Sequence, residues 1–533
     1  MAGQRRTPDE VEIRTSPREP VVDPRLGIDV AAVAAPDARH RLVTVGDSLT
    51  QGFMSGAVHR TDLSWPALVA YELGLPAGAF TFPTYEWPTG PGGLPLDLER
   101  LARAMQDRFG ERLDFWEIVP AGLWLRGYMD GIEDYWERGP GSRPPAPGPP
   151  PDNMGVSGWD LLDPVLLVAS EVAAAIARPT RDDLTSQIVE HHRQLVAWSV
   201  LQRARDGVGE GAADRTVLEA AAAMSAPGEG IETLVVVLGS NNALGSVVSL
   251  EPVWTPEGYA DLPLAERPAA GRGCNLWRPS AFAADWAALE AELRRVAAAH
   301  VVVATVPSVT IAPIARGVAG KVRPASRYFP YYTRPWISDD DFDPGRDPHL
   351  TGEEARAIDS AIDAFNETIV ASVAAARRDG LDWYLFDLAA LLDRLAARRY
   401  IESPWARPAW WTPYELPAAL RALDPVPSTR FFRSGPEGRT DGGLFSLDGV
   451  HPTTIGYGIL AQEVIRVLEM AGVQFRERDG VTPRVGPVEV DFDRLLLADT
   501  LVSDPPALVS RSLSLLGWLD ERLDWVGRSL PFG

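Results

Sequence analysis

Residues 42–52 read Leu42-Val-Thr-Val-Gly46-Asp47-Ser48-Leu49-Thr50-Gln51-Gly52, an apolar run that stops at glycine and then becomes polar. The aliphatic run of 42–46 predicts a buried β-strand. The residues that follow it have two interpretations. Asp47 or Ser48 could cap a helix, because short oxygen-bearing side chains satisfy the free N–H groups of a first helical turn. A serine at the carboxyl end of a buried strand could instead face the crevice where open α/β sheets bind ligands, and act as a nucleophile.

Strand and helix patterns alternate along the rest of the chain. Short apolar runs predict buried strands at 234–238, 301–306 and 383–386, and helical spacing appears at 65–73, 282–298 and 351–378. The last of these helices opens with Thr351 and Glu354 at the spacing of a capping box. Strands that alternate with helices predict a mostly parallel sheet covered on both faces, a three-layer α/β/α sandwich.

The chain divides into a main domain and two flanking segments. Residues 1–38 are polar and proline-rich, and we expect an arm that is poorly ordered or draped over the surface. The main domain covers 39–475, with insertions at about 75–150 and 395–445. The first insertion ends in a polyproline connector at 139–151, and the second is rich in aromatic residues and is either a lid or a mobile segment. The C-terminal appendage, 476–533, carries an amphipathic helix over 508–526 that is expected to pack on the body or to join a second copy in a homo-oligomer.

The overall composition excludes several classes of function. The 533 residues include 51 basic and 73 acidic side chains, a net charge of −22, which opposes binding to nucleic acid or anionic membranes. Cys274 is the only cysteine, so the chain has neither an internal disulfide nor a cysteine-based metal cluster. The sequence shows no secretory signal and no apolar stretch long enough to span a membrane, and we therefore expect a cytoplasmic protein.

A second polar motif lies near the end of the main domain. The stretch Leu447-Asp448-Gly-Val-His451-Pro-Thr-Thr454 precedes a helical pattern over 455–470. A histidine three residues after an aspartate can give one ring nitrogen to the carboxylate while the other faces outward, which is the orientation that a general base needs. A single histidine in a turn is also compatible with a solvated or capping role.

Two glycine- and asparagine-containing stretches lie between these motifs. One is Asn153-Met-Gly155-Val-Ser-Gly158, and the other is Gly239-Ser-Asn241-Asn242, which ends the strand at 234–238. Glycine lets a backbone N–H approach a substrate oxygen closely, and asparagine offers side-chain N–H donors. Each stretch alone is weak evidence, since such residues end many strands.

In this order and context, Ser48, Gly158, Asn241 and the Asp448/His451 pair resemble the blocks of the SGNH hydrolase superfamily, the GDSL lipases and esterases. That family takes its second name from the tetrapeptide that stands here at 46–49. The resemblance covers about residues 40–470 and implies a flavodoxin-like sheet and a serine ester hydrolase. It implies Ser48 as nucleophile, His451 as base and Asp448 as the group that orients His451. The backbone N–H groups of Ser48 and Gly158 and the Asn241 side chain would form the oxyanion hole.

The resemblance implies neither a metal nor an organic cofactor, and its substrate would be a small-molecule or lipid ester. Two departures stand out: Asn242 occupies a position where the family has aspartate, and about 110 residues separate Ser48 from Gly158, which leaves Gly155 as an alternative oxyanion glycine. The alternatives to a carboxylic ester hydrolase are a carbohydrate O-deacetylase, an acyltransferase with the same triad, and a non-catalytic binding scaffold.

Overall fold

The computed structural model describes residues 6–31, 38–85, 92–111, 115–143, 146, 148–178, 180, 189–207, 212–323 and 325–507. The predicted helix over 508–526, and with it the proposed contact to a second copy, lies outside these residues. No helix in the described ranges has both the length and the apolar character needed to cross a bilayer.

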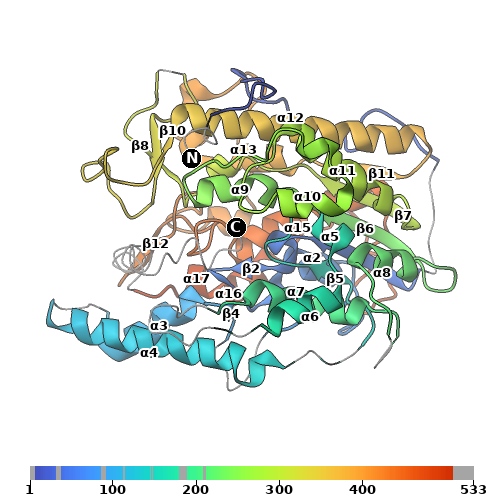
Figure 1. Ribbon diagram of the computed structural model, residues 1–533, viewed down its shortest axis with the longest axis horizontal. Coiled ribbons are helices and arrows are strands. Elements are labelled where there is room, and N and C mark those ends of the chain that lie inside the picture. Colours follow the sequence, from blue (N-terminus) through green and yellow to red (C-terminus); the bar gives the residue numbers. More distant parts are fainter. Residues whose placement is uncertain are drawn as a thin grey trace.

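A five-stranded parallel sheet lies at the centre of the molecule (Figure 1). Counted along the chain, its strands follow the order 2-1-3-4-5, and every neighbouring pair is parallel. The second strand pairs on one side of the first and all later strands lie on its other side, so the loops after the first and third strands diverge and leave a crevice between them. The strands are β1 (His40–Gly46), β5 (Asn153–Gly155), β6 (Ile231–Val237), β7 (Ala298–Ala304) and β11 (Trp383–Phe386).

Alternate side chains of the sheet enter two separate apolar cores, as the period of two in a strand requires. Val43 and Val45 of β1 belong to the first core, whereas Leu42 belongs to the second. The first core is closed by α7 (His192–Ala204), α8 (Val217–Met224), α9 (Asn241–Val248), α11 (Pro279–Leu293) and α12 (Gly352–Arg378). The second is closed by α2 (Trp65–Glu72), α13 (Leu388–Leu395), α15 (Thr454–Ala471) and α16 (Phe492–Ala498). The predicted parallel α/β sheet with helices on both faces is therefore present.

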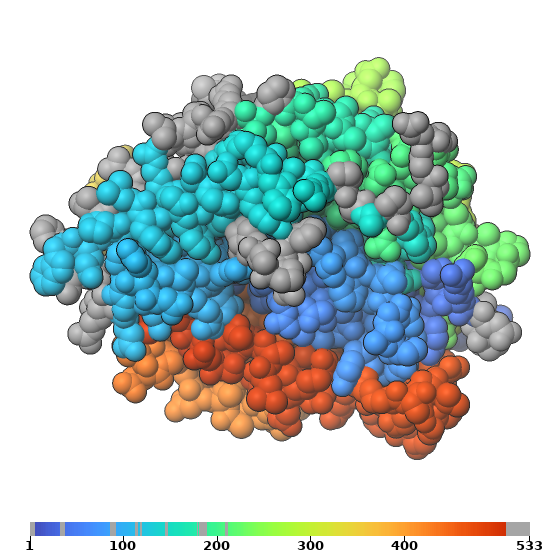
Figure 2. Space-filling view, turned by 90° about the horizontal axis from the view of Figure 1, so that it is seen from below, coloured from blue at the N-terminus to red at the C-terminus, as the bar shows by residue number. Residues whose placement is uncertain are grey.

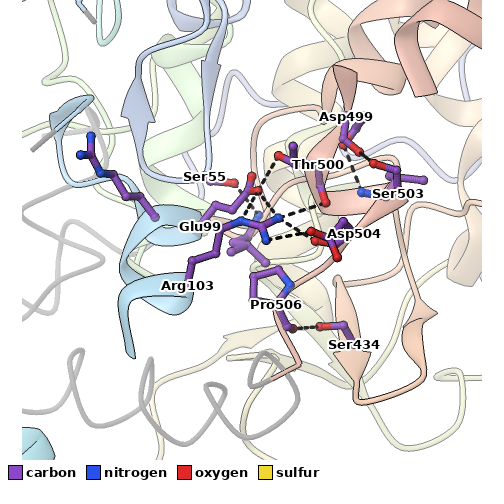
Figure 3. A network of polar contacts seen from close by, with 12 residues as sticks. Ser55, Glu99, Arg103, Ser434, Asp499, Thr500, Ser503, Asp504 and Pro506 are labelled. Atoms are coloured by element: carbon purple, nitrogen blue, oxygen red, sulfur yellow. Dashed lines mark hydrogen bonds and ion pairs between the residues drawn. The ribbon is translucent and has the colours of Figure 1, made fainter. Parts of the chain in front are cut away.

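The first insertion is largely helical. It holds α3 (Leu98–Phe109) and α4 (Ile118–Glu137), and its β4 (Leu94–Pro95) completes a small sheet with β2 (Phe53–Met54) and β3 (Ala57–Val58). Figure 2 shows these helices in light blue beside the red C-terminal part of the described chain. Thr500 donates a hydrogen bond of 2.5 Å to Glu99 of α3, and Arg103 donates one of 2.7 Å to the carbonyl of Asp504 (Figure 3). These contacts fasten the insertion to the segment that follows α15.

The second insertion is irregular, as predicted, but most of its aromatic residues are buried. It contains a π-helical turn (Ala397–Ile401), α14 (Ala418–Arg421), β12 (Arg433–Gly435) and β13 (Gly438–Asp441). Trp411 packs on Tyr400 with ring centroids 5.7 Å apart, and Phe432 is fully buried. The remaining elements are α1 (Ser48–Gln51), α5 (Asp163–Leu166), α6 (Ala169–Ile176), α10 (Arg267–Ala270), α17 (Thr500–Ser503) and a three-stranded sheet of β8 (Arg316–Val318), β9 (Tyr331–Thr333) and β10 (Leu350–Thr351).

The N-terminal segment 6–31 lies along the body of the protein. Of the two predicted arrangements, poorly ordered or draped over the surface, these residues adopt the second. The backbone N–H of Leu385 in β11 donates to the carbonyl of Pro24 at 2.9 Å, and Arg377 donates to the carbonyl of Ile28 at 2.8 Å. The backbone N–H of Val21 donates to the Asp387 carboxylate at 2.7 Å. These bonds satisfy polar groups beside the outermost strand of the central sheet.

The strands predicted at 234–238 and 301–306 run instead over Ile231–Val237 and Ala298–Ala304. The bounds of one helix also differ, and one strand was not predicted. The helix predicted over 282–298 begins at Pro279 and ends at Leu293, because Ala298 already starts β7. Residues 153–155, interpreted only as part of a glycine-rich stretch, form the edge strand β5 beside β1. The capping box at Thr351 and Glu354 is confirmed, with both reciprocal hydrogen bonds present.

Candidate active site

In the turn after β1, Asp47 caps the following helix α1 and Ser48 does not. A Cβ on Gly46 would lie 2.1 Å from Thr50 Oγ1 and 2.7 Å from the carbonyl of Val237, so only glycine lets α1 approach the sheet this closely. Asp47 caps α1 by accepting from the N–H of Leu49 at 2.9 Å, and its burial raises its pKa to about 6. The hydroxyl of Ser48 is therefore not needed as a cap. The capping interpretation is thus confirmed for Asp47.

The turn after Asp448 brings an imidazole to this hydroxyl. His451 Nε2 lies 2.8 Å from Ser48 Oγ, and His451 Nδ1 lies 3.0 Å from Asp448 Oδ2. The exposed fractions of Ser48, His451 and Asp448 are 3%, 2% and 0%, so water competes little for these bonds. Three side chains from two distant parts of the chain thus form one continuous hydrogen-bonded series.

The carboxylate of Asp448 is held by the backbone on both oxygens. Oδ1 accepts from the N–H groups of Val450 and His451 at 2.8 Å each, and Oδ2 accepts from the N–H of Gly56 at 2.9 Å. Burial alone would raise the pKa of Asp448, but His451 and these N–H groups hold it below its ordinary value of 3.8. An ionised Asp448 makes Nδ1 of His451 the protonated nitrogen and leaves Nε2 as the acceptor that faces Ser48.

Neighbouring groups fix the imidazole and the helix behind it. The ring of Phe53 packs on His451 with centroids 4.6 Å apart, and the Tyr457 hydroxyl donates to the carbonyl of Phe53 at 2.6 Å. Buried Asp499, part of the network in Figure 3, accepts from the N–H of Ile455 at 2.9 Å in the first turn of α15. His451 therefore lies between a packed ring and an anchored helix start.

Gly158 and Asn241 lie side by side at the ends of the two strands that flank β1. Asn241 Nδ2 donates to the carbonyl of Trp159 at 2.7 Å, which ties the segment after β5 to the start of α9. A primary amide has two N–H bonds, so one remains for another acceptor. Among the described residues, the backbone N–H groups of Ser48 and Gly158 have no hydrogen-bond acceptor. Three N–H donors thus lie at the carboxyl edge of neighbouring strands.

The geometry distinguishes between the two candidate glycines. Gly155 is the last residue of β5, paired with Gly46, and its N–H already donates to Asn153 Oδ1 at 3.0 Å. Gly158 lies beyond the strand with φ at +84°, a left-handed conformation that favours glycine. Only Gly158 therefore has a backbone N–H to offer.

The side chain of Asn242 is more buried than that of Asn241 and makes fewer hydrogen bonds. It is fully buried, and its side-chain oxygen and nitrogen have no hydrogen-bond partner among the described residues. Its hydrogen bonds come from the backbone: its carbonyl accepts from the N–H of Trp277 at 2.8 Å, and its N–H donates to the carbonyl of Gly239 at 3.2 Å. The side chain of Asn242 thus takes part in no polar network among the described residues.

An apolar cavity of about 120 Å³ opens beside Ser48 and His451. Its walls are mainly aliphatic, and they come largely from α13 and α15 with additional residues from the end of the second insertion. Of the aromatic residues of that insertion, Phe445 lines the cavity and the tryptophans do not. The main aliphatic residues of the wall are Leu388, Leu391, Leu392, Leu395, Ile459 and Leu460.

A larger, polar cavity of about 380 Å³ lies against Gly158 and Asn241. Asp160, Asp163, Arg193 and Arg272 line it together with aromatic rings that include Trp159. Burial raises the pKa of Asp160, and burial together with the neighbouring Asp160 raises the pKa of Asp163 further. The candidate site therefore has an apolar cavity next to Ser48 and a polar one next to Gly158 and Asn241.

Sequence reasoning missed the groups that hold the site from a distance. Nothing in the sequence indicates that the N–H of Gly56 donates to Asp448, because this contact exists only in the folded chain. The aliphatic wall did leave a signal, since Leu388, Leu391, Leu392 and Leu395 have the spacing of one helix face.

Within the described ranges, His, Cys, Asp and Glu side chains nowhere gather in a group of three that could hold a metal ion. Comparison of the chain with protein-family models, with curated proteins and with solved structures gives no significant match.

Proposed function

We propose that this protein is a serine esterase that cleaves carboxylic esters through an acyl-enzyme intermediate. The observation that carries the proposal is the continuous hydrogen-bonded series from Ser48 through His451 to Asp448. The strand order 2-1-3-4-5, which is the flavodoxin-like order, and the SGNH-type motifs support it.

The chemistry follows from the positions of these groups. His451 Nε2 takes the proton of Ser48 as Oγ attacks the ester carbonyl carbon, and Asp448 stabilises the imidazolium that forms. The carbonyl oxygen becomes an oxyanion that accepts from the N–H groups of Ser48, Gly158 and Asn241. The intermediate collapses by breaking the bond to the alcohol oxygen, which takes the proton from His451. Water, deprotonated by the same imidazole, then attacks the acyl-enzyme and releases the acid and free Ser48.

The two cavities indicate which ester fits. The acyl chain would occupy the apolar cavity next to Ser48, and the alcohol would lie in the polar cavity beside Gly158 and Asn241. An apolar cavity of ~150 Å³ accommodates a benzene molecule, so 120 Å³ favours a short to medium acyl chain. The substrate class is therefore an ester of a short to medium carboxylic acid with a polar alcohol.

A series of p-nitrophenyl esters with increasing acyl length tests this function. We expect kcat/KM to be highest at about four to eight carbons, because such chains fill the apolar cavity without exceeding it. A strong preference for acetyl would favour the carbohydrate O-deacetylase instead. Acyl transfer to an added alcohol in place of water would favour the acyltransferase, and no turnover of any ester in the series would contradict the proposal.

Replacing Leu392 by tryptophan should shorten the accepted acyl chain. Leu392 lines the apolar cavity without belonging to the packed cores, so a larger ring fills the cavity with little effect on folding. We expect kcat/KM for the hexanoyl ester to fall at least about tenfold relative to the acetyl ester. Leu497→Trp is the matched control, because Leu497 is 86% exposed and lies away from the cavity. Equal losses for both esters in L392W would show that the acyl chain lies elsewhere.

Replacing Asn241 by alanine should lower kcat by about 10²-fold with little change in KM, because the amide stabilises charge that exists only in the transition state. Asn241→Asp should be no better, since a carboxylate repels the oxyanion. Both variants lose the bond to Trp159, so a larger defect in kcat for the aspartate variant separates charge repulsion from loss of structure. A decrease in kcat smaller than about threefold would remove Asn241 from the oxyanion hole.

A further inference from the structure

A third cavity, of about 210 Å³, lies outside the candidate ester site. It is enclosed by the loop at 310–317, the segment 327–332, the π-helical turn and the strand region at 429–433. Thr429 lines both this cavity and the apolar one, so the two are separated by about one side chain. No group of the proposed ester chemistry lines it.

The lining of this cavity is strongly basic in a chain whose net charge is −22. Six arginines line it against a single carboxylate, Asp441, and they are Arg316, Arg327, Arg398, Arg399, Arg430 and Arg433. Half of them have acidic partners: Arg316 pairs with Asp339, Arg399 with Asp359 and Arg430 with Glu402. The other half, Arg327, Arg398 and Arg433, form no ion pair with any described residue.

Two of the arginines are buried with unused donors. Arg327 is 8% exposed, and its Nε and Nη2 have no hydrogen-bond partner among the described residues. Nη1 of Arg399, which is 5% exposed, also lacks a hydrogen bond, although Asp393 Oδ1 lies 3.7 Å from it. A buried donor of a charged group that lacks an acceptor is costly, by ~1–3 kcal/mol or more. Each of these two guanidinium groups therefore keeps at least one N–H donor without a hydrogen-bonded acceptor.

Lys321, the only lysine of the chain, belongs to the same cluster. Its Nζ donates to the carbonyl of Arg327 at 3.0 Å and lies 4.0 Å from the centre of the Phe329 ring, which Arg398 also contacts. Burial and the positive charges of Arg399 and Arg398 lower the pKa of Lys321 to about 7. Lys321 thus adds a further basic side chain beside the six arginines that line the cavity.

We propose that this cavity is a binding site for a phosphoryl group, held by Arg327, Arg398 and Arg433. Guanidinium groups bind phosphate oxygens in bidentate pairs, and a dianion with several acceptor oxygens suits three unpaired arginines better than a single carboxylate does. Pockets for drug-sized ligands measure roughly 300–1,000 Å³, so 210 Å³ suits an inorganic phosphate or the phosphoryl end of a phosphomonoester.

Calorimetric titration with inorganic phosphate, at constant ionic strength set by chloride, tests the site on the full chain. We expect saturable binding with a dissociation constant below about 1 mM. Arg433→Ala and Arg398→Gln should each weaken binding at least about tenfold, since each removes a charged donor. Arg433 is an exposed residue, so its replacement leaves the packing intact.

Arg323→Ala is the matched control, because Arg323 is an exposed arginine that lies shortly before Arg327 in the sequence and does not line the cavity. It should bind phosphate like the wild type. Absence of saturable phosphate binding by the wild type, or equal affinities in R433A, R398Q and R323A, would overturn the site. Titration with glycerol 3-phosphate distinguishes a phosphomonoester ligand from free inorganic phosphate. Tighter binding than phosphate indicates a phosphomonoester ligand, and equal or weaker binding indicates the free ion.

The single lysine supplies an independent readout. With ¹³C-labelled lysine, the Cε resonance of Lys321 titrates alone, and phosphate should raise its pKa because an anion nearby favours the charged ammonium. An unchanged titration under saturating phosphate would place the bound ion elsewhere. Binding should be the same in Ser48→Ala, so failure of the ester chemistry and failure of this site give distinct results.

Discussion

Replacing Ser48 by alanine should reduce kcat for ester hydrolysis by about 10⁴- to 10⁶-fold. The variant lacks the oxygen that forms the acyl-enzyme, and His451 Nε2 loses the group 2.8 Å away from which it takes a proton. The apolar and polar cavities remain, so ester binding should persist. Steady-state kinetics, together with the affinity for an unreactive substrate analogue, measure the two effects separately.

The fold should tolerate this change. The cap of α1 is Asp47 and not Ser48, so removing the hydroxyl leaves the first turn of the helix satisfied. We expect the circular dichroism spectrum and the melting temperature of Ser48→Ala to match those of the wild type closely. Retention of more than about a hundredth of the wild-type kcat would show that another residue attacks the ester.

Replacing Asp448 by asparagine should lower kcat by about 10⁴-fold while the series of side chains stays assembled. The amide Nδ2 would face His451 Nδ1, which must then accept, so the proton moves to Nε2 and the ring no longer accepts the proton of Ser48. The same Nδ2 would meet the N–H of Gly56, a donor facing a donor. Kinetics and the ¹H resonances of the His451 ring measure the loss of rate and the change of tautomer.

The substitution should also change how stability depends on pH. Because the pKa of Asp448 is below its ordinary value of 3.8 in the folded protein, the carboxylate stabilises the fold above that value. This contribution is lost as pH falls through the folded-state pKa. The free energy of unfolding of Asp448→Asn should therefore fall less than that of the wild type as the solution is acidified below about pH 4. A wild-type kcat in this variant would exclude Asp448 from orienting the base.

The parts of the fold that the sequence could reveal are those with a local pattern. β1, β6, β7 and β11 each contain a short apolar run, and α12 begins at a reciprocal capping box, so each has a signal within its own sequence. β5 has none: its three residues, Asn153-Met-Gly155, are a strand only because β1 lies beside them. Edge strands this short depend on their neighbour more than on their own residues.

The candidate site likewise contains residues that a local sequence pattern indicates and residues whose role only the folded chain determines. Ser48, Asp448 and His451 stand in short motifs whose residue types indicate a base and a nucleophile, and the structure places them in contact. The choice of Gly158 over Gly155 depends on which N–H the sheet already uses, and that is a property of the folded chain. The basic cavity joins residues from 310 to 441, so no local pattern announces it.

Covalent labelling with a fluorophosphonate asks directly whether Ser48 is an activated nucleophile. The reagent phosphonylates only a serine whose proton is taken by a neighbouring base, and peptide mass spectrometry identifies the residue modified. We expect one adduct per chain, on Ser48, with ester hydrolysis lost in proportion to labelling. An unlabelled wild-type protein, or an adduct on another residue while Ser48 remains free, would contradict it.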